Sequence, residues 1–261
     1  MKNQRRVTIY QPRYFPQLHY LNRILSSDIF VILDSAQYTK SLVHATDHGR
    51  RRHSSYQSDT PIKTASGTYM LTVPVRHAGV RPLNQTSLVY TDNWSMRQCA
   101  TIRTSYGKAP YFDVLLPGLE AILKYRYETL ADLNIATISW ALSALCGIPD
   151  AHDLSLKSVN QILTTKPKVR LKRILRDQET GVTRPAGNQK GTEWTIALCQ
   201  AVGATEYIYG GTAREGYMDL SVYQKSSIHT VEQNWRCPIY PQLFTGTAGF
   251  EANLSIIDIV M

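Results

Sequence analysis

A strand, a proline-framed turn, a helix and a second strand are predicted within the first 34 residues, and this order constrains the fold more than any other feature. Residues 7–10 (VTIY) form a short apolar run, Pro12 and Pro16 frame the turn, and residues 30–33 (FVIL) form the next apolar run. About thirty residues is the length of one βαβ unit, in which a helix crosses between two parallel strands. The chain is therefore expected to begin as part of a parallel sheet.

Strand and helix patterns continue to alternate along the chain, which predicts an α/β fold with a largely parallel sheet flanked by helices. Between residues 94 and 146 the apolar residues recur at helical spacing, so the middle region is expected to be mainly helical. Residues 41–66 are polar and include the basic run 50–53 (RRRH), so a basic loop insertion is expected there. We find no internal repeat and expect a single domain over residues 1–261. Further strands are predicted at 69–75, 86–90, 207–209 and 227–231, and a further helix at 192–202.

The composition favours a cytoplasmic protein with anionic partners. Hydrophobic residues make up 43% of the chain, yet no apolar run reaches the roughly 18 residues that a membrane helix needs. The first residues, MKNQRRV, are basic but no apolar segment follows them as in a signal peptide. A formal net charge of +9 favours phosphate-bearing cofactors, nucleotide sugars, acidic carrier proteins or nucleic acid. Charge alone does not choose among these partners.

The four cysteines predict neither a metal site nor a disulfide framework. Cys99, Cys146, Cys199 and Cys237 lie far apart, without a C-x-x-C pair or a histidine at zinc-finger spacing. We interpret them as reduced thiols that mostly pack in the core. Cys237, in a predicted loop between an arginine and a proline, is the best candidate for a reactive thiol.

Polar residues follow three of the predicted strands, where an open parallel sheet binds its ligands. Gln11 comes directly after the first strand, and the prolines of its turn stiffen the bend. Asp34 ends the second apolar run, at a position where a carboxylate can orient an amine or a hydroxyl. The glycines after residues 207–209, together with Arg214, could hold a phosphate or carboxylate. The predicted substrate-binding residues are Gln11, Gln37, Lys40, Gly210, Gly211 and Arg214, with Asp34 as a catalytic residue.

Simpler roles stay open for several of these residues. Capping of the next turn is the alternative for Asp34, and solvation in a loop is the alternative for Lys40. Two glycines at a strand end often form only a turn, and they lack the G-x-G-x-x-G spacing of a dinucleotide site.

Two histidines are candidates for the catalytic base, His19 and His44. His19 lies in a strand–proline–histidine–helix order similar to that of nucleotidyltransferases, where paired histidines cradle phosphates. The second histidine of such a pair is absent, because the sequence continues Tyr20-Leu21-Asn22.

The order of eight separate motifs resembles the WbqC-like family, and the match spans nearly the entire chain. The residues that carry the resemblance are Tyr10–Pro16 (YQPRYFP), Asp28–Tyr38 (DIFVILDSAQY), Ile62–Thr64 with Gly67, Leu71–Val75, Tyr106–Phe112 (YGKAPYF), Gly203–Thr205 with Tyr207, Tyr240–Gln242 (YPQ) and Leu254–Asp258 (LSIID).

This resemblance implies a small-molecule transferase, because family members are associated with bacterial O-antigen, other glycan and natural-product gene clusters. The leading hypothesis is transfer of an acyl or aminoacyl group from a thioester to an amine, in glycan or specialised-metabolite biosynthesis. The donor would be a thioester of coenzyme A or of phosphopantetheine on an acidic acyl or peptidyl carrier protein, and no cofactor or metal would be tightly bound. The acceptor would be a small molecule.

Two alternatives stay open. One is a nucleotidyl- or phosphate-handling enzyme, which the first turn suggests. The other is a non-catalytic protein that binds a carrier protein or nucleic acid through the basic stretches 50–53 and 166–176. We do not expect nucleic acid as a partner, because no nucleic-acid motif accompanies the charge.

The chain departs from the family pattern at three places. Relatives carry an Asn-Arg pair before the Ile-Lys segment, a histidine four residues after the tryptophan, and a histidine before the Tyr-Pro-Gln segment. Here these places correspond to residues 50–60, Gln98 and Cys237. If those histidines are catalytic in relatives, this protein uses other groups or a specialised substrate.

Overall fold

The computed structural model describes residues 4–39, 42–45, 51–76, 79–146, 155–185, 191–211, 213, 216 and 218–261, with the backbone alone at 42–45 and 51–54. The chain forms two compact units. Unit 1 comprises residues 1–11, 19–35 and 160–236, and unit 2 comprises residues 12–18, 36–159 and 237–261. The expectation of a single domain stays a prediction.

Unit 1 is built on a five-stranded parallel sheet with the strand order β7-β2-β1-β8-β9, which confirms the predicted α/β fold. Strands β2 and β7 lie on one side of β1, and β8 and β9 lie on the other, so the order reverses between β1 and β8. The strands are β1 (Arg6–Tyr10), β2 (Ile29–Ile32), β7 (Arg173–Arg176), β8 (Glu206–Tyr209) and β9 (His229–Glu232).

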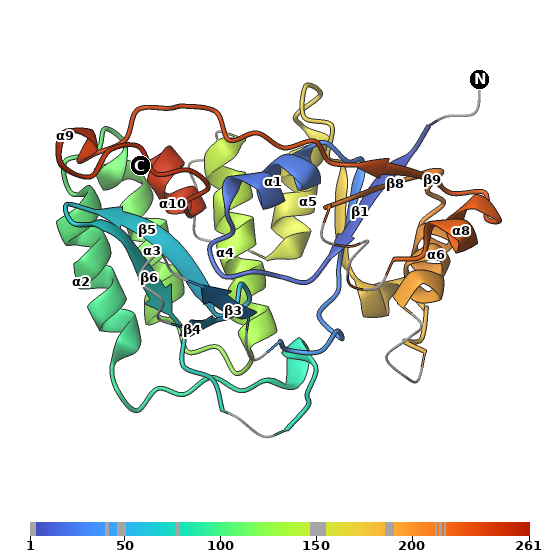
Figure 1. Ribbon diagram of the computed structural model, residues 1–261, viewed down its shortest axis with the longest axis horizontal. Coiled ribbons are helices and arrows are strands. Elements are labelled where there is room, and N and C mark those ends of the chain that lie inside the picture. The colour runs from blue at the N-terminus through green and yellow to red at the C-terminus, as the bar shows by residue number, and fades with distance from the viewer. Residues whose placement is uncertain are drawn as a thin grey trace. The chain divides into compact units, whose positions relative to one another are not determined.

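Helices cover both faces of this sheet, as the crossover connections of parallel strands require. Figure 1 shows α1 (Leu18–Leu25) and α5 (Leu156–Thr164) to one side of the strands, and α6 (Gly191–Ala201) and α8 (Leu220–Gln224) to the other. A 3₁₀ turn, η2 (Asp177–Thr180), follows β7. Strand β2 is buried along its whole length, which explains its uninterrupted apolar sequence IFVI.

Unit 2 contains the mainly helical middle region that the sequence predicts. Its helix α4 is buried along nearly its whole length, including the polar residues Asn134 and Thr137. Its N-cap Thr129 accepts a hydrogen bond from the Asp132 amide at 3.2 Å. The helices and 3₁₀ turn of this unit are η1 (Leu83–Gln85), α2 (Trp94–Tyr106), α3 (Phe112–Lys124), α4 (Leu130–Leu145), α9 (Thr245–Ala248) and α10 (Ile256–Val260).

The predicted loop at 41–66 is wrong, because this segment contains three strands. Strand β3 (Leu42–Ala45) pairs antiparallel with β4 (Arg51–Ser54), and β5 (Asp59–Thr64) pairs antiparallel with β6 (Gly67–Thr72). Strand β5 could not be recognised from the sequence, because its residues Thr60 and Lys63 are polar although they are buried. Another correction concerns the strand predicted at 86–90, which forms only isolated bridges at Ser87 and Leu88.

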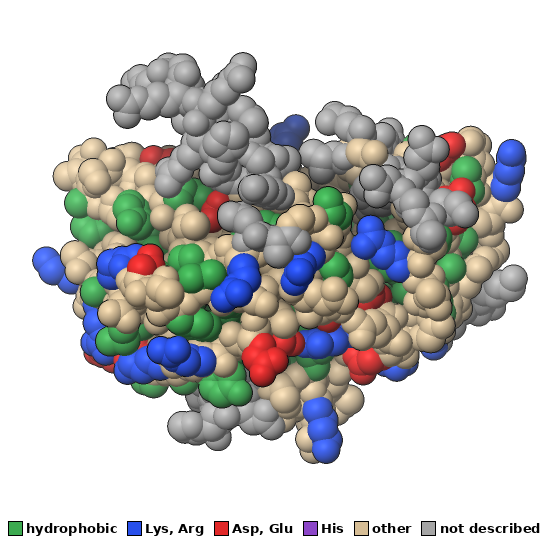
Figure 2. All heavy atoms as spheres, turned by 90° about the horizontal axis from the view of Figure 1, so that it is seen from below, with side chains coloured by type: hydrophobic (Ala, Val, Ile, Leu, Met, Phe, Trp, Pro, Cys, Tyr) green, Lys and Arg blue, Asp and Glu red, His purple; other side chains and the backbone are tan. Residues whose placement is uncertain are grey.

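The positive charge is dispersed rather than gathered on the face that Figure 2 shows. Lys and Arg side chains stand there singly or in small groups, with Asp and Glu between them. Part of the basic stretch 166–176 is neutralised by acids, because Arg170 pairs with Asp28 at 3.1 Å and Arg176 with Asp34 at 3.4 Å. Within the described ranges no helix is long and apolar enough to cross a membrane.

Candidate functional site at the carboxyl edge of the parallel sheet

The reversal of strand order between β1 and β8 marks the point where open α/β sheets bind their ligands. Val7 lies opposite Tyr207 in this pair, so Gln11 and Gly210 both emerge at the carboxyl edge. Tyr10 lies opposite Ile32 in the neighbouring pair, which places Asp34 two residues beyond β2 at the same edge. Four residues predicted from the sequence, Gln11, Asp34, Gly210 and Gly211, therefore lie along one edge of one sheet.

A buried arginine that the sequence analysis missed lies at this reversal point. Arg23 on α1 has only 6% of its surface exposed, and its guanidinium lies over the ring of Tyr10, 5.0 Å from the ring centre. A Cβ atom built on Gly210 would lie 2.5 Å from Nη2 of Arg23. Because Gly210 has no side chain, the Arg23 guanidinium fills the space beside it. The main chain of Gly210 therefore lies close to a positive charge.

Gln233, the first residue after β9, fixes the position of Arg23. Its Oε1 accepts a hydrogen bond from Nε of Arg23 at 2.9 Å. Its Nε2 donates to the His19 carbonyl at 2.9 Å and to Oδ1 of Asn22 at 2.8 Å. Tyr10 at the end of β1 and Gln233 after β9 thus hold the Arg23 guanidinium in a fixed orientation, which is how a preorganised anion site is built.

A second polar group lies at the ends of β2 and β7. The carboxylate of Asp34 is fully buried, and its Oδ2 lies 3.4 Å from Nε of Arg176. Ser35 donates a hydrogen bond from its hydroxyl to Asp177, and its carbonyl accepts one from Nη1 of Arg184 at 2.9 Å. A buried carboxylate at this edge is suited to bind and orient a cation, such as the ammonium of an amine substrate.

The other predicted site residues are not brought to this edge by the described structure. His19 lies half-buried on α1, where its carbonyl is held by Gln233. Gln37 belongs to unit 2, where it forms an isolated bridge with Pro82. His44 lies in β3, where only the backbone is described. Lys40 and Arg214 lie outside the described residues.

Gly210→Ala is expected to displace the Arg23 guanidinium and to lower the free energy of unfolding by about 1–2 kcal/mol, because the added methyl overpacks a filled site. Urea denaturation of the full chain measures this change. Gly216→Ala is the control, since a Cβ there meets nothing within 4 Å. Equal stability of the two variants would contradict the placement of Arg23 against Gly210.

A separate polar network in unit 2 joins residues from four of the segments that carry the family resemblance. The ammonium of the fully buried Lys63 donates to Oε1 of Gln242 at 2.9 Å and to the carbonyl of Gly249. Nε2 of Gln242 donates in turn to Oδ2 of Asp258 at 2.8 Å. Two tyrosine hydroxyls complete the shell of this carboxylate, from Tyr106 to Oδ1 and from Tyr240 to Oδ2, each at 2.9 Å.

Burial governs the ionisation of this network. It raises the pKa of Asp258 above the ordinary value, although three hydrogen bonds and nearby Lys63 oppose the shift. Burial and the neighbouring carboxylate also raise the pKa of the Tyr106 hydroxyl, so this group stays protonated and acts as a donor. Because the polar groups of this network form hydrogen bonds with one another, we assign the network a role in holding β5, α2, the 240–249 segment and α10 together.

Comparison with known proteins places the chain in a family. The WbqC-like protein family matches residues 11–261. The chain belongs to the WbqC-like family. It is also similar to the uncharacterized protein Rv1507c of Mycobacterium tuberculosis (strain ATCC 25618 / H37Rv), with 27% identity over 260 residues that cover 98% of this chain and 93% of that protein. No solved structure matches the chain.

At two of the places where this WbqC-like protein departs from the family pattern, the residue present forms hydrogen bonds within unit 2. Gln98 accepts a hydrogen bond from the Tyr14 hydroxyl at 2.5 Å and donates to the Thr72 carbonyl at 2.9 Å. Sγ of Cys237 accepts a hydrogen bond from the Asn253 amide at 3.3 Å. Both side chains therefore bind neighbouring segments of unit 2. Among the described residues no group of His, Cys, Asp and Glu is placed to hold a metal ion.

Proposed function

We propose that this WbqC-like protein is a small-molecule transferase that moves an acyl or aminoacyl group from a thioester to an amine at the carboxyl edge of the unit 1 sheet. The observation that carries the proposal is the buried, fixed Arg23 guanidinium beside Gly210, at the point where the strand order reverses. A desolvated guanidinium at that point suits a phosphate or carboxylate group of a substrate.

Each group at the edge has a proposed task. Arg23, Gly210 and Gly211 would bind an anionic group of the donor, such as a phosphate of coenzyme A or of phosphopantetheine. Asp34 would bind and orient the acceptor amine. The amine nitrogen forms a bond to the thioester carbonyl carbon, the carbon–sulfur bond breaks, and the thiol leaves. Because a protonated amine has no lone pair, its proton must first pass to a base, and Asp34 is the predicted catalytic residue that lies at this edge.

A phosphate-handling enzyme is the second candidate, because an arginine beside a double glycine at the reversal point would equally hold a nucleotide phosphate. In that reaction the amine or hydroxyl acceptor would attack phosphorus rather than a carbonyl carbon. The two functions share the anion site and differ in the bond that breaks.

The experiment that tests the proposal is a product search by mass spectrometry with the purified full chain. Acyl and aminoacyl thioesters of coenzyme A and of a carrier protein are offered with a panel of amines, and nucleoside triphosphates are offered in parallel. Amide product with release of thiol supports the thioester transferase. Nucleotide consumption without amide product supports the second candidate. Binding of thioesters without any turnover would contradict both.

A further inference from the structure

A cavity of about 350 Å³ lies at the opposite, amino edge of the unit 1 sheet, and the proposed function does not use it. Its volume is in the range of small-molecule sites. The apolar part of the lining comes from Ile29 and Val202, and the polar part comes from the segments that begin β1, β2 and β7. The lining residues are Gln4, Arg5, Asp28, Ile29, Lys172, Arg173 and Val202.

Three cations line this cavity without a carboxylate of their own. Within the described part of the chain, Arg5, Lys172 and Arg173 form no ion pair. One N–H of Arg5 donates to the Val202 carbonyl at 3.2 Å, and the Lys172 ammonium donates to the Lys166 carbonyl at 2.9 Å. A guanidinium has five N–H donors and an ammonium has three, so most donors of these groups remain for a ligand.

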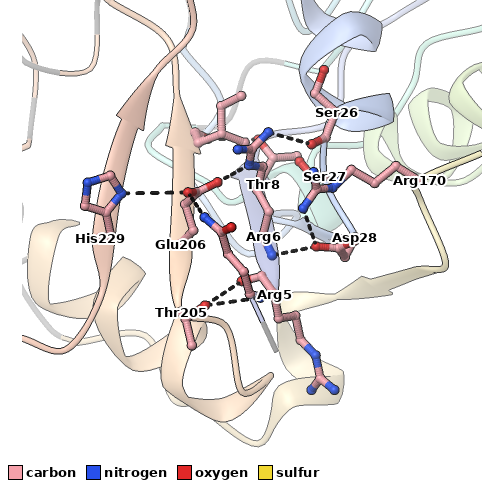
Figure 3. Close-up of polar contacts among 12 residues, drawn as sticks. Arg5, Arg6, Thr8, Ser26, Ser27, Asp28, Arg170, Thr205, Glu206 and His229 are labelled. Atoms are coloured by element: carbon pink, nitrogen blue, oxygen red, sulfur yellow. Dashed lines mark hydrogen bonds and ion pairs between the residues drawn. The ribbon is translucent and has the colours of Figure 1, made fainter. Parts of the chain in front are cut away.

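The acids near the cavity are engaged by other residues, as Figure 3 shows. Oδ2 of Asp28, the acid that lines the cavity, accepts hydrogen bonds from the Arg6 amide at 2.7 Å and from Nη2 of Arg170 at 3.1 Å. Glu206 is paired with the Arg6 side chain and lies 3.7 Å from Nδ1 of His229. The Arg5 guanidinium extends away from this cluster. The cavity lining therefore carries three cationic side chains and one carboxylate, which is itself paired with Arg170.

We propose that this cavity is a binding site for a small organic oxyanion, a carboxylate or phosphate attached to a short apolar group. The oxyanion would be held by Arg5, Lys172 and Arg173, which repel one another in its absence, and the apolar group would lie against Ile29 and Val202. Arginine matches both oxyanions with paired N–H donors, so the cations alone do not separate carboxylate from phosphate.

The site is independent of the proposed transfer site. The strands between the two edges are four or five residues long, so the edges lie roughly 15 Å apart at about 3.3 Å per residue. An anion bound at the amino edge therefore does not touch Arg23, Asp34 or Gly210, and its binding is measurable without any knowledge of the reaction.

Isothermal titration calorimetry of the full chain with phenylphosphate, and separately with benzoate, tests the proposal at fixed low ionic strength. The double variant Lys172→Gln/Arg173→Gln is expected to lower the affinity for the bound probe at least tenfold. The double variant Lys157→Gln/Lys225→Gln removes two charges from exposed positions elsewhere and is expected to change the affinity less than twofold. Affinity should also fall as salt is raised.

The two probes distinguish a phosphate ligand from a carboxylate ligand, because the probe that binds more tightly carries the oxyanion that the cavity prefers. Amide chemical shifts of Ile29 and Val202 on titration report whether the probe enters this cavity. Failure of both probes to bind would overturn the proposal, as would equal binding by the two double variants. So would loss of binding in Gly210→Ala but not in Lys172→Gln/Arg173→Gln, because the anion would then bind at the carboxyl edge.

Discussion

Asp34→Asn is expected to lower the turnover of the proposed transfer at least about 100-fold while the protein stays folded. Asparagine keeps the shape of the side chain but removes the charge that would bind and orient the acceptor ammonium. The arginine beside it, Arg176, is one third exposed and can be solvated, so loss of its partner does not leave a buried unbalanced charge. Steady-state kinetics with the amine varied at saturating thioester measure the effect.

The neighbouring acid provides the matched control for this experiment. Asp177 is also buried at the carboxyl edge, where it accepts hydrogen bonds from the Ser35 hydroxyl and, at 3.0 Å, from the Gln178 amide. Asp177→Asn is therefore expected to lower stability but to leave turnover within about fivefold of the original protein. If Asp34→Asn kept turnover within the same range, or if Asp177→Asn abolished it, the role proposed for Asp34 would be refuted.

Much of unit 1 could be predicted from the sequence because its strands are short apolar runs separated by helix patterns. The continuous run IFVI of β2 is typical of a strand buried on both faces, and the spacing of β1 and β2 requires a parallel crossover. The strand order could not be predicted, since it depends on contacts between β1 and β8, two hundred residues apart. That order is what locates the reversal point.

The candidate site was only partly predictable for the same reason. Gln11, Asp34 and Gly210 follow strands, so their position at one edge follows from sheet topology. Arg23 and Gln233 could not be recognised from the sequence. A lone arginine on an amphipathic helix and a glutamine in a loop are usually exposed surface residues. Burial of Arg23 against Tyr10 and Gly210 distinguishes it, and burial is a property of the folded chain.

Unit 2 was predicted less well because several of its buried residues are polar. The polar segment around Lys63 predicts a solvated lysine, yet Lys63 is fully buried and binds Gln242 and the Gly249 carbonyl. One signal was available, since Lys63, Tyr106 and Asp258 each lie in a segment that carries the family resemblance. Polar residues in such segments could have been expected to meet, although the sequence does not say that they form a core network.

Lys63→Met is expected to lower the free energy of unfolding by about 3 kcal/mol at neutral pH, because it leaves buried acceptors on Gln242 and Gly249 without a donor and removes the cation near Asp258. Guanidinium denaturation of the full chain measures this loss. Lys108→Met is the matched control, since Lys108 is exposed and its replacement should change stability by less than about 0.5 kcal/mol.

The pH dependence of Lys63→Met tests the cause of this loss. Burial already raises the pKa of Asp258 in the folded protein, and removal of Lys63 raises it further, because the nearby cation favours the charged carboxylate. A folded-state pKa above the unfolded one means that the folded form binds the extra proton, so stability falls as pH rises from about 4, the unfolded pKa of aspartate, toward the folded pKa. The loss in the free energy of unfolding that Lys63→Met causes should therefore be smaller near pH 4 than at neutral pH. Asp258→Asn in the Lys63→Met background should remove this dependence on pH. A deficit that is constant across this range would show that lost packing, rather than the unbalanced carboxylate, is responsible.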